Sequence, residues 1–206
     1  VLRLTQRGHS STDTEKAARL IRDHGFNLGL QMMIGLPGDS LEKSIGTAEK
    51  IIGLGAVETR IYPTLVIKGT KLEELFQQGY YKPLTLDEAV DWSAKLVTLF
   101  EENGINVLKV GLHPSESLMD GNELVAGPFH PSFRELVLTE IWRDILQPLC
   151  TDNGRSIEIV VSNRELNHAV GYNGQNKKML LKNFEKVRLI TNALLKGRDH
   201  KISIAA

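Results

Sequence analysis

Hydrophobic positions in the first 114 residues change repeatedly between helical and strand spacing. Apolar residues three and four apart predict helices near residues 12–24, 39–53 and 85–103, and apolar runs predict strands at Phe26–Ile34, Glu58–Ile67 and Asn106–Leu112. A short helix is expected at Leu72–Gln77. Strands separated by helices of this length pair in parallel through right-handed crossovers. Because the series opens with a helix, we expect at least one earlier strand in the same sheet.

Capping residues set the predicted helix ends. Thr12 with Glu15, and Thr85 with Glu88, have the spacing of capping boxes, and Asp39 is suited to cap the second helix. In the first helix, the residues expected to face the core are Ala17, Ala18, Leu20 and Ile21.

The second half of the chain has a different organisation. Residues 114–131 are predicted to be a loop, and an amphipathic helix follows from Ser132 to about Leu149. A strand, two short helices and a strand then follow at 157–161, 164–170, 177–184 and 187–191, with a last strand at 201–204. We therefore predict three regions: residues 1–114, a connecting region at 115–150, and a small α+β module at 151–206.

Composition narrows the class of protein. The 206 residues are 41% hydrophobic and 24% charged, as in a soluble globular protein, and no apolar run reaches the ~18 residues of a membrane span. The single cysteine, Cys150, excludes an intrachain disulfide and favours the cytoplasm. The net charge is zero, but residues 151–206 carry ten basic and five acidic side chains. This asymmetry indicates two modules with different partners.

A glycine-rich turn, Gly35-Leu36-Pro37-Gly38, lies where a predicted strand meets a helix. In parallel α/β proteins the loops at the carboxyl ends of strands surround the ligand, and glycine allows close approach of the backbone. The alternative is a tight strand-to-helix connection without a ligand. The spacing excludes a Walker phosphate loop.

Several motifs resemble, in order, one group of radical S-adenosylmethionine (SAM) enzymes. They are Arg7-Gly8-His9, Gly29 to Asp39, Ile61 to Thr70, Val110 to Pro114, and Leu124 to Pro131 with Phe133 and Arg134. The group is similar to the radical SAM domain of the elongator catalytic subunit, and more distantly to oxygen-independent coproporphyrinogen oxidase.

This resemblance implies an α/β fold, the C-terminal part of a partial (β/α)6 TIM-like barrel with parallel strands. It also implies SAM and a [4Fe-4S] cluster as cofactors, with Ile34, Gly35, Leu36, Tyr62 and Leu65 on the SAM side. The cluster needs three cysteines at Cys-x3-Cys-x2-Cys spacing, which this chain lacks. We therefore expect the cluster ligands, and the other half of the barrel, upstream of Val1. No metal ligand and no catalytic residue is predicted within these 206 residues.

Three further side chains are candidate contacts to substrate or SAM. Arg7 and His9 would follow a barrel strand, and Lys68, before Gly69-Thr70, could meet an anion at a helix start. The alternative for His9, and equally for His113 and His130, is a loop histidine that is hydrogen-bonded to the backbone. The alternative for Lys68 is that Lys68-Gly69-Thr70 only caps the helix, without a ligand.

The order strand–helix–GxxG–helix–strand in the basic C-terminal region resembles the KH fold of RNA-binding proteins. In that fold the GxxG loop holds the backbone of single-stranded RNA. The implied RNA contacts are Gly171, Tyr172, Asn173, Gly174, Lys177, Lys178 and Lys182. The alternative is a helical hairpin with a glycine turn and no ligand.

The preferred prediction is a radical SAM enzyme acting on RNA, with tRNA as the candidate, and with no DNA or membrane partner. The chain leaves no room for the acetyltransferase domain of elongator-like enzymes, so acetyl-CoA chemistry is not predicted. Two alternatives remain: a radical SAM enzyme on a small molecule such as a porphyrinogen, and a non-catalytic RNA-binding protein.

Overall fold

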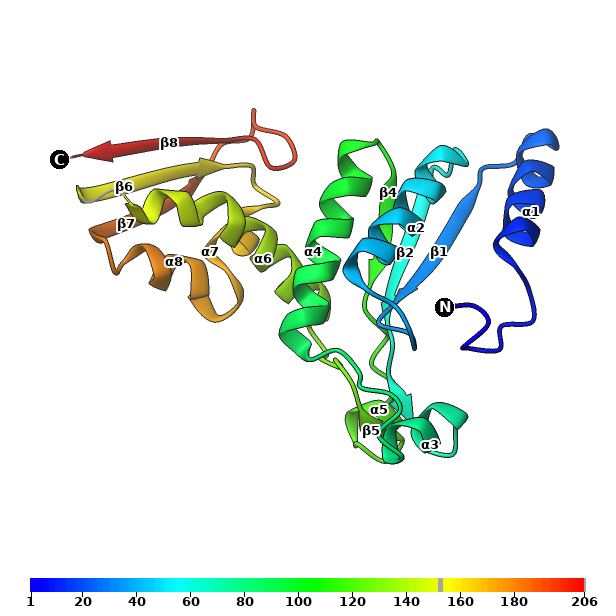
Figure 1. The fold of residues 1–206 in the computed structure, drawn as a ribbon. Helices are drawn as coiled ribbons and strands as arrows, with labels where there is room; N and C mark the ends of the chain where they lie inside the picture. The colour runs from blue at the N-terminus through cyan, green and yellow to red at the C-terminus, as the bar shows by residue number, and fades with distance from the viewer. Residues whose placement is uncertain (152–153, 206) are drawn as a thin grey trace. The chain divides into compact units, whose positions relative to one another are not determined.

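The computed structural model describes residues 1–151 and 154–205 (Figure 1). The chain forms two compact units, Val1–Arg134 and Glu135–Ala206, and each is described by itself.

The first unit is built around a parallel sheet. Its elements are α1 (Ser11–Asp23), β1 (Gly29–Ile34), α2 (Leu41–Gly53), β2 (Glu58–Pro63), β3 (Val66–Ile67), α3 (Lys71–Gln77), α4 (Leu86–Glu102), β4 (Asn106–Val110), α5 (Glu116–Met119) and β5 (Leu124–Ala126). The sheet order is β1-β2-β4, and both neighbouring pairs are parallel. The predicted parallel pairing of the three strands at 26–34, 58–67 and 106–112, which correspond to β1, β2 and β4, is confirmed.

Strand alternation divides this sheet into two unlike faces. Met32 and Ile34 of β1 lie in register with Ile61 and Pro63 of β2, and all four are buried. Helices α2 and α4 contact each other and pack on β1 and β4, so they cover this face (Figure 1). Intervening residues point the other way and remain at least partly exposed. The sheet therefore has one covered face and one open face.

The start of the first unit differs from the sequence prediction. Ser10, not Thr12, caps α1, and its capping box partner is Asp13. The predicted inward residue Leu20 is 60% exposed, and among the described residues of α1 only Ala18 is buried. Phe26, the predicted first residue of a strand, is 70% exposed, and β1 begins at Gly29. The capping box of Thr85 and Glu88 is confirmed at the start of α4.

Two segments beyond the sheet also depart from expectation. The strand predicted through Ile67 ends at Pro63, which lacks the N–H that a continuing ladder needs. The remaining residues form β3, which pairs antiparallel with β5. That partner lies within the predicted loop at 114–131, so pairing distant in sequence creates a strand too short to be recognised by its pattern.

The second unit is a three-stranded sheet covered by helices. It contains α6 (Phe133–Leu146), whose first two residues belong to the first unit, a short 3₁₀ segment (Gln147–Thr151), β6 (Gly154–Val161), α7 (Leu166–Val170), α8 (Gln175–Leu180), β7 (Phe184–Thr191) and β8 (His200–Ala205). The order is β7-β6-β8, with β6 parallel to β7 and antiparallel to β8. The predicted order of elements is present, including the last strand.

Helix α6 supplies much of the core of this unit. Trp142 and Leu146 are fully buried against Ile157 and Ile159 of β6 and Leu180 of α8. The sequence prediction places this helix in a connecting region at 115–150 and starts the module at 151. Packing instead places residues from 135 onward in the second unit, because the apolar face of α6 is buried against the sheet.

Three residues, Trp142, Glu165 and His168, form a polar cluster at the edge of that core. Trp142 Nε1 donates a hydrogen bond to Glu165 Oε2 at 2.6 Å. His168 lies between two carboxylates, with its ring nitrogens 3.4 Å from Glu165 Oε2 and 3.3 Å from Glu135 Oε2. Burial acts to raise the pKa of Glu165, but hydrogen bonds from His168 and Trp142 outweigh it, so the pKa falls below its ordinary value of 4.5.

Trp142→Phe tests the hydrogen bond between Trp142 and Glu165. The variant should lower the free energy of unfolding by about 2 kcal/mol at pH 7, because a hydrogen bond to a charged carboxylate is lost. Since the pKa of Glu165 is lowered in the folded state, its stabilising contribution is present above pH 4.5 and is lost as the pH falls below that value. Urea unfolding should therefore show a smaller difference between variant and parent at acid pH than at pH 7. The matched control is Trp92→Phe, at the half-exposed tryptophan of α4; equal effects of the two variants would contradict the assignment.

Candidate functional site

The turn after β1 is held by one carboxylate. Asp39 Oδ2 accepts hydrogen bonds from the Gly35 N–H and the Ser44 hydroxyl, both at 2.9 Å, and its Oδ1 accepts from the Ser40 N–H at 2.9 Å. Ser40 is the residue that caps α2, with its side chain accepting from the Lys43 N–H. The prediction that Asp39 caps this helix is therefore wrong by one residue. Asp39 instead fixes the conformation of the turn itself.

Tyr81 and Leu84 cover the same turn from the segment between α3 and α4. The Tyr81 hydroxyl donates to the Gly35 carbonyl oxygen at 2.7 Å. Burial, with a smaller contribution from the Asp39 carboxylate, raises the pKa of Tyr81 to about 12, so the phenol stays protonated at neutral pH. A β-carbon at Gly35 would come within 2.8 Å of Leu84 Cδ1, and the φ of this residue is +75°. Only glycine fits here without rearrangement.

The predicted SAM-side residues lie in two different environments. The side chain of Ile34 is 0% exposed and belongs to the covered layer, and Leu65 is also buried. The Ile34 carbonyl oxygen accepts a hydrogen bond from the Thr64 hydroxyl at 2.7 Å. Leu36 and Tyr62, by contrast, are half-exposed. The residues with a surface for a ligand are therefore Leu36, within the turn, and Tyr62, on the open face.

The open face carries polar side chains that sequence reasoning did not select. Gln31 lies in register with Arg60, and Met33 lies in register with Tyr62. Lys109 of β4 lies in register with Arg60 on its other side. The signal is present in the sequence as strand alternation, since these residues are the ones between the buried positions. It becomes readable only once the register between strands is known.

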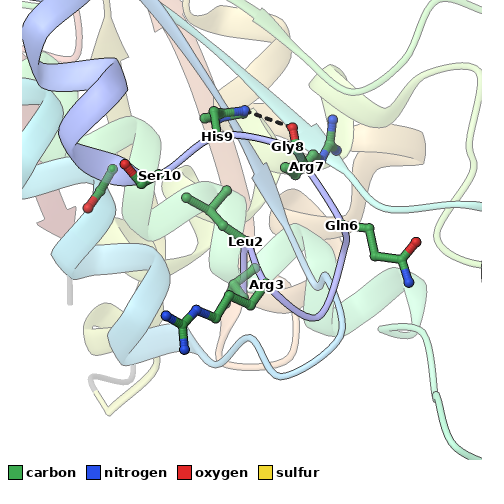
Figure 2. Close-up of a pocket in the computed structure, with 9 residues that line it drawn as sticks. Leu2, Arg3, Gln6, Arg7, Gly8, His9 and Ser10 are labelled. Atoms are coloured by element: carbon green, nitrogen blue, oxygen red, sulfur yellow. Dashed lines mark hydrogen bonds between the residues drawn. The ribbon is translucent and has the colours of Figure 1, made fainter.

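The N-terminal segment places Arg7 beside this face. Arg7 Nη2 donates to Met33 Sδ at 2.6 Å. Nine residues of the segment 1–11, Arg7 and His9 among them, also line a hollow of about 630 Å³ (Figure 2). His9 Nδ1 lies 3.0 Å from the Arg7 carbonyl oxygen, so this nitrogen bonds to backbone and Nε2 is the one directed elsewhere. The structure thus places Arg7, but not His9, in contact with a residue of the sheet's open face.

Other candidates have local structural partners. The Lys68 N–H donates to the Glu123 carbonyl at 2.9 Å, and its side chain is exposed. Thr70 caps α3, and the Gly69 N–H donates to Glu73 Oε2 at 2.6 Å. The Gly69 N–H, which an anion at this helix start would approach, thus bonds within the cap. His130 Nδ1 accepts from the Ser132 N–H at 3.0 Å, as in a loop histidine bonded to backbone.

The two glycines of the GxxG loop do different things. Gly171 is buried with φ +85° and ψ 155°, a conformation almost confined to glycine. A β-carbon there would lie 2.9 Å from the Asn176 backbone nitrogen and 3.1 Å from Thr139 Cγ2. Gly174 is left-handed with φ +74°, and its hypothetical β-carbon meets only Lys178 Cε, at 3.9 Å. The first glycine is required by packing, whereas the second faces open space.

Helix α6 anchors this loop. Thr139 Oγ1 accepts a hydrogen bond from the Tyr172 N–H at 2.8 Å, and its carbonyl oxygen accepts from Asn176 Nδ2 at 3.0 Å. Asn176 is almost fully buried. Tyr172 is half-exposed, while Asn173, Lys177, Lys178 and Lys182 are exposed. The loop is thus fixed from below and presents a basic outer surface.

Comparison with known proteins shows which families the chain is similar to. Residues 58–143 match the Radical_SAM C-terminal domain. The chain is 37% identical over 94 residues to a tRNA uridine(34) acetyltransferase of Methanocaldococcus infernus, covering 44% of this chain and 18% of that protein. It is 36% identical over 102 residues to Elongator complex protein 3 of Dictyostelium discoideum, covering 48% and 18%. Residues 58–143 are thus similar to the Radical_SAM C-terminal domain, and the chain is similar in sequence to these two elongator-like proteins.

A solved structure supports this similarity. The archaeal Methanocaldococcus infernus Elp3 with an N-terminal deletion superimposes with a TM-score of 0.63 at 28% identity, over 70% of this chain and 33% of that one. This chain spans about a fifth of the length of the curated relatives it matches. Within residues 1–151 and 154–205, no helix has the length and apolar character needed to cross a bilayer. The same residues contain no group of three or more His, Cys, Asp or Glu side chains placed to bind a metal.

Replacing each loop glycine by alanine tests their separate roles. Gly171→Ala should lower the unfolding free energy by about 3 kcal/mol, because a forbidden conformation and a close approach to Asn176 act together. Gly174→Ala should cost only about 1 kcal/mol, from its left-handed backbone alone. Urea unfolding of the two variants measures both values. A reversed order of stability would show that the loop is not anchored at Gly171.

Proposed function

We propose that this chain is part of a radical SAM enzyme that modifies RNA, with tRNA as the candidate substrate. The observation that carries the proposal is the braced glycine turn at the carboxyl end of β1, beside an open sheet face. The match of residues 58–143 to the Radical_SAM C-terminal domain supports SAM as the cofactor, and the similarity to a tRNA uridine(34) acetyltransferase supports tRNA as the substrate class.

The residues of this region fit a nucleoside-like cofactor. Leu36 offers apolar surface within the turn, and the Tyr62 ring lies on the open face, where it could stack on an adenine. Asp39 and Tyr81 hold both polar groups of the Gly35 backbone, so the turn is rigid before a ligand arrives. Bound SAM would supply a 5′-deoxyadenosyl radical for hydrogen abstraction.

The cluster that reduces SAM requires ligands other than those in this chain. One cysteine, Cys150, cannot supply the thiolates of a [4Fe-4S] cluster. The prediction of cluster cysteines upstream of Val1 therefore stays part of this proposal, as does the barrel that they would complete. The residues described above would bind and orient the cofactor and exclude water from one side of it.

The second unit supports RNA as the substrate. Its open loop at Asn173 and Gly174, the exposed lysines that follow, and the net charge of +5 over residues 151–206 suit a phosphate backbone. The order of elements resembles that of KH domains, in which such a loop contacts single-stranded RNA. We propose that Tyr172, half-exposed beside the loop, stacks on a base.

Tyr62→Ala tests the cofactor site in the complete protein. Loss of the stacking ring should raise the Kd for SAM about tenfold, because stacking of a base on an aromatic ring contributes roughly 1–3 kcal/mol. Anaerobic equilibrium dialysis with SAM measures the change. Tyr80→Ala is the matched control, since Tyr80, which precedes Tyr81 in the sequence, is 79% exposed. Absence of SAM binding by the parent protein would reject the proposed function.

The RNA surface is tested by two variants. Gly174→Asp should weaken binding of a short single-stranded RNA at least tenfold, because a carboxylate replaces open space next to the phosphates. Lys177→Gln should reduce the steepness of log K against log salt by about 0.7, because one phosphate is no longer neutralised by a lysine. Fluorescence anisotropy over a salt series measures both. Lys186→Gln, in β7, is the control. RNA binding that is unchanged in both Gly174→Asp and Lys177→Gln would favour the small-molecule enzyme.

A further inference from the structure

Two cations lie directly opposite each other on the open face of the first sheet. Arg60 of β2 and Lys109 of β4 are in register, and both are half-buried. Their strand neighbours Thr59, Ile61 and Val110 are buried on the covered face, which fixes the direction of the two cationic side chains. A register shift in β4 just before this pair brings Lys109, instead of Leu108, opposite Arg60.

Neither cation has an acidic partner in the part of the chain that the structure describes. Every ion pair found there involves other basic residues. Glu58 precedes Arg60 by two residues in β2, but its carboxylate leans over β1: a β-carbon at Gly29 would lie 2.9 Å from Glu58 Oε1. The nearest acidic residue in the strand is thus directed toward Gly29 and away from Lys109.

A third cation contacts the same face of the sheet. Arg7 reaches the same face through its hydrogen bond to Met33, which lies in register with Tyr62, the next residue of β2 on the open face after Arg60. Like charges directly opposite each other in a sheet are destabilising. A sheet that gathers them on one face is best balanced by an anion bound among them.

We propose that Arg60 and Lys109 form an oxyanion subsite on the open face, which binds a carboxylate or phosphate group of a ligand. The guanidinium fork suits two oxygens of such a group, the ammonium adds a point charge, and the Gln31 amide lies opposite Arg60 as a further donor. The identity of the ligand rests on the proposed function: the oxyanion is either the carboxylate of SAM or a phosphate of the RNA.

The experiment uses Arg60→Gln and Lys109→Gln in the complete protein, with Arg60→Lys as the conservative variant. The probes are inorganic pyrophosphate, SAM, decarboxylated SAM and a short single-stranded RNA. Pyrophosphate binding should weaken about fivefold or more in each glutamine variant and recover in part in Arg60→Lys, because charge-assisted hydrogen bonds are removed. The matched control is Arg19→Gln, at an exposed position of α1.

The other probes identify the source of the oxyanion. If it is the SAM carboxylate, the variants weaken SAM binding about tenfold and leave decarboxylated SAM unchanged. If it is an RNA phosphate, they weaken RNA binding and reduce its salt dependence by about 0.7 for each phosphate bound.

Two results would overturn the subsite. One is equal binding of all four probes by the parent and both glutamine variants. The other is unchanged probe binding with a lowered melting temperature, which would mean that an acidic side chain of the protein itself pairs with the two cations. Pyrophosphate keeps this test separate from the proposed function: absence of SAM and RNA binding in the parent protein rejects that function, while the pyrophosphate result still decides the subsite.

Discussion

In the first unit, the alternation of side chains along a three-stranded parallel sheet determines which residues are buried and which lie on the open face. Helices α2 and α4 bury one set of alternate residues, including Ile34 and Ile61, and this burial fixes the register in which β1, β2 and β4 lie. A slip of one residue would exchange the two faces and bury Arg60 without a partner, at a large cost. The apolar layer therefore decides, without touching any ligand, which polar residues stand on the open face.

The glycine turn after β1 shows how a backbone conformation is kept. Asp39 bonds to the N–H of Gly35 and Tyr81 bonds to its carbonyl, and these two residues come from segments far apart in the sequence. Such bonds stabilise a left-handed residue that would otherwise relax. In the second unit, Thr139 and Asn176 hold the loop that begins at Gly171 in a comparable way. In both places a polar side chain inside the structure prepares an exposed stretch of backbone.

The two units present different chemistry. The open face of the first combines the Tyr62 ring with the cations Arg60 and Lys109, which suits a ligand with an aromatic base and an oxyanion. The second offers lysines around a fixed glycine loop, which suits a repeating phosphate backbone. Radical SAM chemistry on RNA would use both kinds of surface, and the elongator-like relatives are named for tRNA modification and for the Elongator complex.

Local sequence patterns determined the alternation of helices and strands and the capping box of Thr85 and Glu88, and the ordered motifs indicated the similarity to radical SAM proteins. These features depend on residues close together in the chain, so their physical causes are visible in the sequence. Only the tertiary structure decided that Asp39 braces a turn instead of capping a helix, that β5 pairs with β3, and that α6 belongs to the second unit. The same holds for the meeting of Arg60 and Lys109, because the register between strands depends on packing between residues far apart in sequence.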